Sequence, residues 1–347
     1  MSCGQIAFKQ LGIEVERYVS CEIDKYAIQV TQHNFPVTEQ CGDVFTADFT
    51  KYAGFDWLIF GSPCTYWSVA KGKNRETIAS GIGWELFSQG VKALREVQPR
   101  YFLYENNQSM SKQIRAAIDK AFGFEAVEIN SALVSAQNRR RLYWVGKRNA
   151  DGSYSRVNVP LPVDKGGCLR DVLDSGATWQ EKSYCLTATY MNAVVKDVFV
   201  RRKRTMVAEP IRIDTIENNA KNVQFDSKQY RVYSPDGKAT TLCGQGGGVG
   251  AKTGLYAVPT NSDVKAKPIY EVRDGQILID GAWYPIKLAD GFYVVRKLSV
   301  NECKRLQTVP DWYDMTCISN SQAYKCLGNG WTVEVIMHLI RCALDEE

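Results

Sequence analysis

The chain has 347 residues, of which 45% are apolar and 23% are charged, a composition typical of a globular protein with about two domains. Its formal net charge of +5 permits a nucleic-acid partner but does not indicate one. No apolar run approaches the ~18 residues that a membrane span needs, and the N-terminus lacks the pattern of a secretory signal. We therefore expect a cytoplasmic protein that does not contact a membrane.

Histidine and cysteine usage narrows the chemistry. His33 and His338 are the only histidines, so centres built on several histidines are excluded and we expect no bound metal. The 11 cysteines form no Cys-x-x-Cys pair, and an odd number in a long chain argues against a disulfide framework. We predict free, mostly buried thiols in a reducing compartment.

The first 149 residues alternate between strand-like and helix-like segments. The predicted strands are 18–22, 57–60, 101–104, 125–129 and 141–146. The predicted helices are 24–33, 84–97 and 109–122. This alternation predicts an α/β fold, with a parallel sheet that helices cover on both faces.

The rest of the chain divides into two parts. Residues 150–295 are rich in β-branched residues and glycine, and Asp236-Gly237 and Asp274-Gly275 are hairpin signals. This part is therefore predicted to be a smaller, mostly β domain. Helical spacing returns after residue 296, and we expect residues 296–347 to rejoin the domain formed by residues 1–149.

Chemically active side chains follow several of the predicted strands. Glu22, Cys64 and Glu105 each stand at the carboxyl end of a strand, where open α/β sheets bind their ligands. Farther along, Arg139 and Arg141 alternate so that a strand would place them on one face. Taken singly, such a cysteine is more often a small buried side chain, such a glutamate a helix cap, and such arginines a solvated edge.

Together and in this order, these residues resemble the motifs of the DNA cytosine-5 methyltransferase family of phages and bacteria, over nearly the whole chain. The matching segments are Gly61-Ser62-Pro63-Cys64, Glu105-Asn106, Gln137-Asn138-Arg139-Arg140-Arg141, Arg296 to Gln307 with Pro310, Ser321 to Lys325, and Gly328 to Trp331. The resemblance implies a Rossmann-like S-adenosylmethionine-dependent methyltransferase sheet with a smaller, mostly β target-recognition domain. It also implies methylation of cytosine C5 in double-stranded DNA by a monomeric enzyme.

Cytosine-5 methylation explains why these residue types occur. A cysteine thiolate that adds to cytosine C6 makes C5 nucleophilic, and the resemblance assigns this role to Cys64. It places Glu105 at N3 and Arg141 at O2, where both stabilise the charge that develops on the ring. We expect Arg139 to raise the thiolate fraction of Cys64, because nearby positive charge favours thiolates. The base must leave the duplex stack to reach the cysteine.

The expected cofactor is S-adenosyl-L-methionine. Glu22 would bridge ribose hydroxyls, Ile23 would stack on the adenine, and Asp43 would bind the adenine amino group. In isolation, Asp43 reads equally well as a turn former and Asp24 as a helix cap. The full set of expected cofactor residues is Met1, Ser2, Cys3, Gly4, Glu22, Ile23, Asp43, Val44, Pro63, Leu86, Asn329, Gly330 and Trp331.

Two segments are expected to contact DNA. The loop after Cys64 is flexible, aromatic and basic, although Thr65 stands where the family often has glutamine. The glycine-rich stretch 239–254 resembles the recognition loop of the family and favours close backbone approach to a ligand. The expected DNA-binding residues are Trp67, Ser68, Lys71, Lys73, Arg75, Thr241, Gly246, Gly247 and Gly248.

The first family motif departs from its usual form. That motif is a strand ending in Phe-x-Gly followed by a tight turn into a helix, and here the turn begins directly at Met1-Ser2-Cys3-Gly4-Gln5. We expect the natural product to carry a few more residues upstream. We also expect the chain as given to be less stable and to bind the cofactor poorly, because unpaired backbone groups destabilise a sheet.

Three alternatives remain open at this point. An RNA cytosine methyltransferase could share the scaffold, although the ~145-residue β region favours duplex DNA, whose groove it could read. A DNA-binding homologue without catalytic activity is a second alternative, and the presence of Cys64, Glu105, Arg139 and Arg141 argues against it. An enzyme that transfers a larger one-carbon group to cytosine is the third.

Overall fold

The computed structural model describes residues 1–211, 214–215, 231–232 and 268–345. The chain forms two compact units. Unit 1 comprises Met1–Val172, Lys182–Met191 and Val300–Glu347, and unit 2 comprises Leu173–Glu181 and Asn192–Ser299. The unit 1 boundary differs from the sequence prediction, because residues 150–172 and 182–191 pack with the α/β part.

The centre of unit 1 is a four-stranded sheet in the order β3-β4-β6-β5, with β7 paired to β6. Its strands are β3 (Trp57–Gly61), β4 (Tyr101–Asn107), β5 (Val127–Asn130), β6 (Arg140–Arg148) and β7 (Tyr154–Arg156). Strands β3 and β4 are parallel, but β6 is antiparallel to both β4 and β5. The prediction of a wholly parallel sheet is wrong for β6. The link from β5 to β6 carries only a 3-10 turn, Ser131–Leu133, whereas a parallel crossover needs a dozen or more residues.

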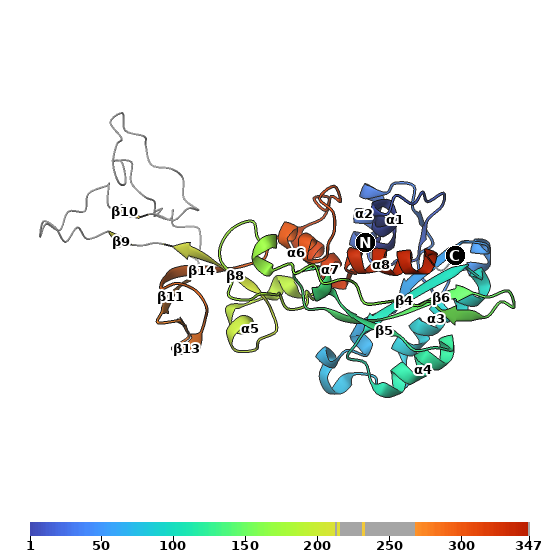
Figure 1. Cartoon of the computed structure of the whole chain (residues 1–347), viewed down its shortest axis with the longest axis horizontal. Helices are drawn as coiled ribbons and strands as arrows, with labels where there is room; N and C mark the ends of the chain where they lie inside the picture. Colours follow the sequence, from blue (N-terminus) through green and yellow to red (C-terminus); the bar gives the residue numbers. More distant parts are fainter. Residues whose placement is uncertain (212–213, 216–230, 233–267, 346–347) are drawn as a thin grey trace, which may run out of the picture. The chain divides into compact units, whose positions relative to one another are not determined.

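Helices lie on both faces of this sheet, as predicted (Figure 1). The helices of unit 1 are α1 (Cys3–Gln10), α2 (Lys25–Asn34), α3 (Ile82–Val97), α4 (Lys112–Phe122), α6 (Val300–Leu306), α7 (Asn320–Asn329) and α8 (Val333–Leu344). On one face, α3 and α4 bury Phe87, Ile114 and Phe122 against the aromatic side chains of the sheet. On the other, α8 contacts both α1 and β6, so the C-terminal helices complete unit 1.

A second, two-stranded sheet belongs to unit 1. Strands β1 (Val19–Ser20) and β2 (Glu39–Gln40) run parallel, with Ser20 opposite Gln40. This register places Cys21 beside Cys41, and the two form a disulfide with a Cα–Cα distance of 5.0 Å. The prediction of free thiols is wrong for this pair, because strand pairing brings together cysteines that are 20 residues apart. The other described cysteines are free.

Unit 2 is mostly β, as predicted. Its strands are β8 (Met206–Ile211), β9 (Asp214–Thr215), β10 (Arg231–Val232), β11 (Ile269–Arg273), β12 (Gln276–Ile279), β13 (Ala282–Pro285) and β14 (Gly291–Lys297), with one short helix, α5 (Val195–Phe199). Asp274-Gly275 forms the predicted hairpin with φ values of 51° and 69°. Asp236-Gly237, Thr241 and Gly246 to Gly248 lie outside the described residues.

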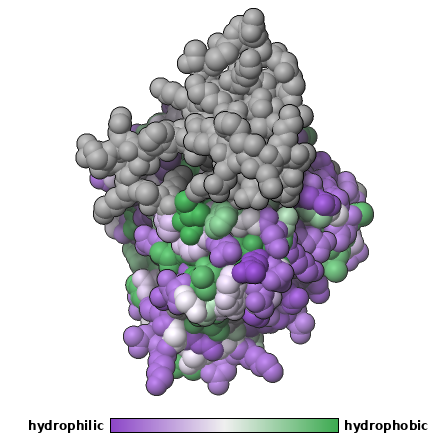
Figure 2. Space-filling view, turned by 90° about the vertical axis from the view of Figure 1, so that its left-hand side faces the viewer, coloured by the Kyte–Doolittle hydropathy of each residue, from purple (hydrophilic) through white to green (hydrophobic). Residues whose placement is uncertain are grey.

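The surface carries mainly hydrophilic side chains on the face seen in Figure 2, with hydrophobic ones scattered among them. Among the helices that the structure describes, none is long and apolar enough to span a membrane.

Candidate active site

Cys64 begins a single 3-10 turn, Cys64–Tyr66, three residues after β3 ends at Gly61. Gly61 pairs with Glu105 across the parallel strands. A Cβ on Gly61 would lie 3.1 Å from the Glu105 carbonyl oxygen and 3.3 Å from the Trp331 ring. The close packing at Gly61 favours glycine, and it brings the Cys64 loop next to the predicted carboxylate.

Two buried amides hold the Cys64 loop. Asn106 has no exposed surface, and its Nδ2 donates to the Ser62 carbonyl at 3.2 Å, to Ser62 Oγ at 3.0 Å and to the Tyr104 hydroxyl at 2.9 Å. Asn107 Nδ2 donates to the Cys64 carbonyl at 3.4 Å. The sequence marked Asn106 only as part of a motif, whereas the structure shows that both amides position the loop.

Glu105 accepts a bond on each carboxylate oxygen. Arg141 Nε lies 2.9 Å from Oε1, and Trp331 Nε1 donates to Oε2 at 2.8 Å. The strand register puts Asn107, two residues beyond Glu105, opposite Arg141. The structure therefore brings Glu105 and Arg141 together as expected. It adds Trp331, which was expected only beside the cofactor.

Arg139 mainly stabilises the fold, by donating hydrogen bonds to backbone carbonyls of distant segments. Its side chain is buried, with 3% exposed, and donates to the carbonyls of Leu186 at 3.1 Å, Gly328 at 3.3 Å and Gly330 at 2.7 Å. Gln137 is on the same face, as the alternation predicted, and accepts from Leu186 N at 2.8 Å. These bonds join the residues just before β6 to the 182–191 segment and to the end of α7.

Burial and four neighbouring groups act on the pKa of Cys64. Burial raises the pKa of the Cys64 thiol above its ordinary value, and Arg141 and Arg139 offset this only in part, because Glu105 and Cys185 raise it. Arg141 is the stronger of the two positive influences. As expected, Arg139 lowers the pKa of Cys64 and so favours its thiolate, but its influence is weaker than that of Arg141, and burial outweighs both.

A second cysteine, Cys185, lies at the same place, and no sequence motif predicted it there. Cys185 Sγ accepts from Arg139 Nη1 at 3.3 Å and from Arg141 Nη2 at 3.7 Å. Burial alone would raise the pKa of the Cys185 thiol, but the charges and hydrogen bonds of Arg139 and Arg141 outweigh it and lower the pKa.

Of the residues after Cys64 that were expected to bind DNA, some are buried in the protein and others are exposed to solvent. Trp67, expected to contact DNA, is instead a core residue with no exposed surface, and it donates to Glu76 Oε2 at 3.0 Å. Its indole anchors the loop, so the DNA-binding expectation for Trp67 is not supported. Lys71 and Lys73 are exposed, whereas Arg75 Nη1 donates to the Ser109 carbonyl at 3.0 Å. The half-buried Ser68 donates its N–H to the Cys64 carbonyl.

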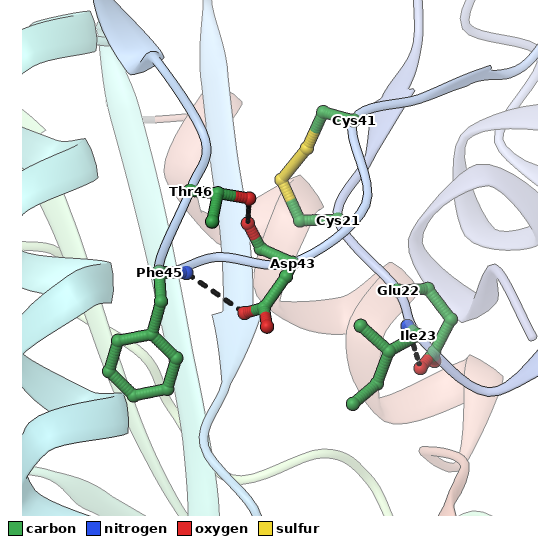
Figure 3. The surroundings of a disulfide bond; sticks show 7 residues. All are labelled: Cys21, Glu22, Ile23, Cys41, Asp43, Phe45 and Thr46. Atoms are coloured by element: carbon green, nitrogen blue, oxygen red, sulfur yellow. Dashed lines mark hydrogen bonds between the residues drawn. A yellow bond between two sulfur atoms is a disulfide. The ribbon is translucent and has the colours of Figure 1, made fainter.

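The expected adenosine residues follow β1 and β2, on either side of the disulfide (Figure 3). Glu22 Oε1 accepts from Ile23 N at 2.9 Å, and Asp43 Oδ1 accepts from Phe45 N at 2.9 Å. Ile23 is 75% exposed and Phe45 is 42% exposed. The sequence did not single out Phe45, although an aromatic residue just after the Asp43 turn is a usable signal for a ring-binding site. Val44 is half-buried.

The other expected cofactor residues cluster at the start of α1 and the end of α7. Trp331 N donates to Cys3 Sγ at 3.3 Å. A Cβ on Gly330 would lie 3.3 Å from Met1 Cε and 3.4 Å from Cys3 Sγ. The remaining expected residues are the buried Ser2 and Gly4, the half-buried Leu86, and the exposed Pro63 and Asn329.

Comparison with solved structures defines the class of fold. The chain aligns with the methyltransferase EhMeth of Entamoeba histolytica at a TM-score of 0.57 and 13% identity, covering 99% of this chain and 95% of that one. It aligns with the Dnmt2 methyltransferase of S. pombe at a TM-score of 0.55 and 13% identity, covering 99% and 95%. Unit 1 therefore has a methyltransferase fold.

Sequence comparison then identifies the family. The model of the C-5 cytosine-specific DNA methylases matches residues 2–343, so the chain belongs to this family. The orphan methyltransferase M.Rho11sI of Bacillus phage rho11s is 30% identical over 73% of this chain, which spans 58% of that relative's length. The orphan methyltransferase M.SPRI of Bacillus phage SPR is 25% identical over 97% of this chain and 94% of its own. The type II methyltransferase M.HhaI of Haemophilus parahaemolyticus is 25% identical over 96% of this chain and 89% of its own length.

Proposed function

We propose that this protein is a DNA (cytosine-5-)-methyltransferase that uses Cys64 as a nucleophile on a cytosine flipped out of duplex DNA. One observation carries the proposal: the Cys64 loop ends beside the Glu105–Arg141 pair, with Arg141 Nε 2.9 Å from Glu105 Oε1. A nucleophile next to a carboxylate and a guanidinium is the arrangement that addition to a cytosine ring requires.

The residues around the disulfide fit S-adenosyl-L-methionine. Ile23 and Phe45 are large apolar side chains that remain exposed, which suits them to cover the faces of a purine. Glu22 and the exposed Asp43 offer carboxylate oxygens for ribose hydroxyls and an amino group. When bound, this cofactor supplies an electrophilic methyl group. Met1, Cys3 and Gly330 would then border its methionine end.

The reaction follows from what Cys64, Glu105 and Arg141 can each do. Cys64 is held as a thiol by burial, so as the sulfur bonds to C6 its proton must pass to the ring N3, by way of the neighbouring Glu105 carboxylate. Arg141, with a positive charge beside the ring, stabilises negative charge at O2, and Glu105 hydrogen-bonds the N3 edge. After C5 has accepted the methyl group, loss of the C5 proton to a bound water restores the C5–C6 double bond and expels Cys64, which recovers its proton from N3 by the same route.

Duplex DNA is the proposed partner. Exposed Lys71 and Lys73 near Cys64 are suited to phosphates. Within the predicted 150–295 segment, the part that belongs to the mostly β unit 2 is proposed to read the target sequence. The RNA alternative predicts methyl incorporation into tRNA and none into duplex DNA. Comparing both substrates in one assay with labelled cofactor decides between them.

A trapping experiment tests the mechanism. Duplex DNA that carries 5-fluorocytosine at the target should form a stable covalent adduct, because fluorine cannot leave C5 as a proton does. Peptide mass spectrometry should place the adduct on Cys64. An active enzyme that forms no adduct, or forms it on another residue, would contradict the proposed nucleophile.

A further inference from the structure

Cys185 has a place in the active site that methyl transfer by Cys64, Glu105 and Arg141 does not explain. Its sulfur lies within 3.3 Å of Arg139 Nη1 and 3.7 Å of Arg141 Nη2. It is thus shared by Arg139, just before β6, and Arg141, within β6, and a sulfur that accepts from two guanidinium groups is stabilised as a thiolate.

The position of Cys185 is fixed by the segment that carries it. Residues 182–191 belong to unit 1, whereas the residues on both sides belong to unit 2. Lys182 Nζ donates to the Ala132 carbonyl at 2.9 Å, and Leu186 N donates to Gln137 Oε1 at 2.8 Å. Gly328 packs so closely that an added Cβ would come within 2.2 Å of the Thr187 backbone. Cys185 therefore cannot drift away from the arginines without disrupting these contacts.

We propose that Cys185 is a positioning residue: an anionic counterpart that holds Arg139 and Arg141 in place and competes with Cys64 for their positive charge. The inference rests on the proposed methyl transfer. Burial is the main reason that the pKa of Cys64 is raised, and Cys185 adds to it as a smaller influence, while the pKa of Cys185 itself is lowered.

Other charged and titratable groups surround both sulfurs. Five groups interact electrostatically with Cys64 or Cys185 and so are linked to their pKa values. They are Arg139, Arg141, Glu105, Tyr104 and Tyr143. One contact opposes the thiolate form: Cys185 Sγ lies 3.4 Å from the Leu186 carbonyl, to which only a protonated thiol could donate. The pH at which Cys185 reacts decides between the two forms.

The first experiment measures alkylation of each cysteine by iodoacetamide as a function of pH, in the full chain without DNA. Peptide mass spectrometry should show Cys185 reacting at lower pH than Cys64. Cys185→Ser should move the Cys64 profile to lower pH by roughly one unit, because a nearby like charge is lost. Cys185→Asp retains a negative charge and should keep the wild-type profile.

The control variant leaves the charge at residue 185 unchanged, and the contradicting outcomes are those in which that charge makes no difference. Cys168→Ser removes a half-exposed thiol that is not bonded to either arginine and should leave the Cys64 profile unchanged. An unchanged profile in Cys185→Ser overturns the proposal, as does an equal shift in the serine and aspartate variants. If either variant fails to fold, the wild-type protein still decides: Cys185 reacting only at higher pH than Cys64 overturns the proposal.

Steady-state kinetics separate this inference from the proposed function. The acid limb of kcat/KM should move with the alkylation profile in Cys185→Ser and return in Cys185→Asp. If the wild-type protein methylates neither duplex DNA nor tRNA but shows the expected alkylation, the proposed function fails and the electrostatic role of Cys185 stands. If it methylates DNA and alkylation is insensitive to Cys185, only the inference fails.

Discussion

The nucleophile side and the cofactor side of unit 1 are built in contrasting ways. Around Cys64, buried side chains hold one another, with Asn106 bonded to Ser62 and Tyr104, and Glu105 bonded to Arg141 and Trp331. After β1 and β2, the expected ligand-binding side chains lie open to solvent, and Ile23 is 75% exposed. A disulfide between Cys21 and Cys41 joins the ends of these two strands.

This contrast shows that the protein's own contacts order the nucleophile side, whereas a bound ligand would help to order the cofactor side. The buried network fixes catalytic groups before a substrate arrives, which lowers the reorganisation needed during the reaction. The cofactor side presents exposed apolar side chains, so a ligand that covers them contributes burial energy itself. Changes on the nucleophile side should therefore affect kcat, and changes on the cofactor side should affect cofactor affinity and stability.

The largest effect is expected from Cys64→Ser. A serine hydroxyl is a much weaker nucleophile than a thiolate, so methyl transfer should fall by more than about 10⁴-fold. DNA affinity should change little, as measured by fluorescence anisotropy. Cys168→Ser is the matched control and should retain activity. Substantial activity in Cys64→Ser would reject covalent catalysis by this residue.

The disulfide gives the next largest effect. The cysteines close a loop with a sequence separation of 20, for which the loop-entropy argument gives about 3 kcal/mol of stability. Adding reductant, or making Cys21→Ser with Cys41→Ser, should lower the melting temperature and weaken S-adenosylmethionine binding, as measured by calorimetry. Reductant should have no effect on the double variant. A wild-type melting temperature unaffected by reductant would show that the bridge does not stabilise the fold.

Asn106→Ala tests the buried network. It removes the buried amide that donates to the Ser62 carbonyl and to the Ser62 and Tyr104 hydroxyls, so the free energy of unfolding should fall by about 1–3 kcal/mol. Misplacement of the Cys64 loop should lower kcat by roughly 10- to 100-fold. Asn149→Ala is the matched control, because Asn149 is exposed and its side chain bonds only to the nearby Ser153 and Ser155. Equal kcat in the two variants would mean that Asn106 does not position the nucleophile.

Trp331→Phe should have the smallest effect. It keeps an aromatic ring but removes the N–H that donates to Glu105, a bond whose loss should cost about 0.5–1.5 kcal/mol. We expect kcat to fall about 3- to 10-fold with little change in KM for DNA. Trp312→Phe, at a partly exposed tryptophan, serves as the control. A decrease confined to cofactor affinity would assign Trp331 to the cofactor side alone.

Part of this arrangement was predictable from the sequence because it depends on local rules. Apolar runs located β3 and β4, and the carboxyl ends of adjacent parallel strands meet at one edge, so Cys64 and Glu105 had to be close. Alternation located Gln137, Arg139 and Arg141 on one face. The Asp274-Gly275 turn followed from the backbone conformations that a tight hairpin requires.

The remaining features were decided by contacts between residues far apart in the chain. The β1–β2 register paired Cys21 with Cys41, and core packing turned Trp67 away from the surface. Arg139 donates to carbonyls of residues that are 47 and 189 positions away in the chain. The 182–191 segment also brings Cys185 within hydrogen-bonding distance of Arg139 and Arg141. Sequence periodicity records which face a side chain occupies, but not which distant segment covers that face. The residue types at the active site were thus set by the sequence, and their partners and charges only by the tertiary structure.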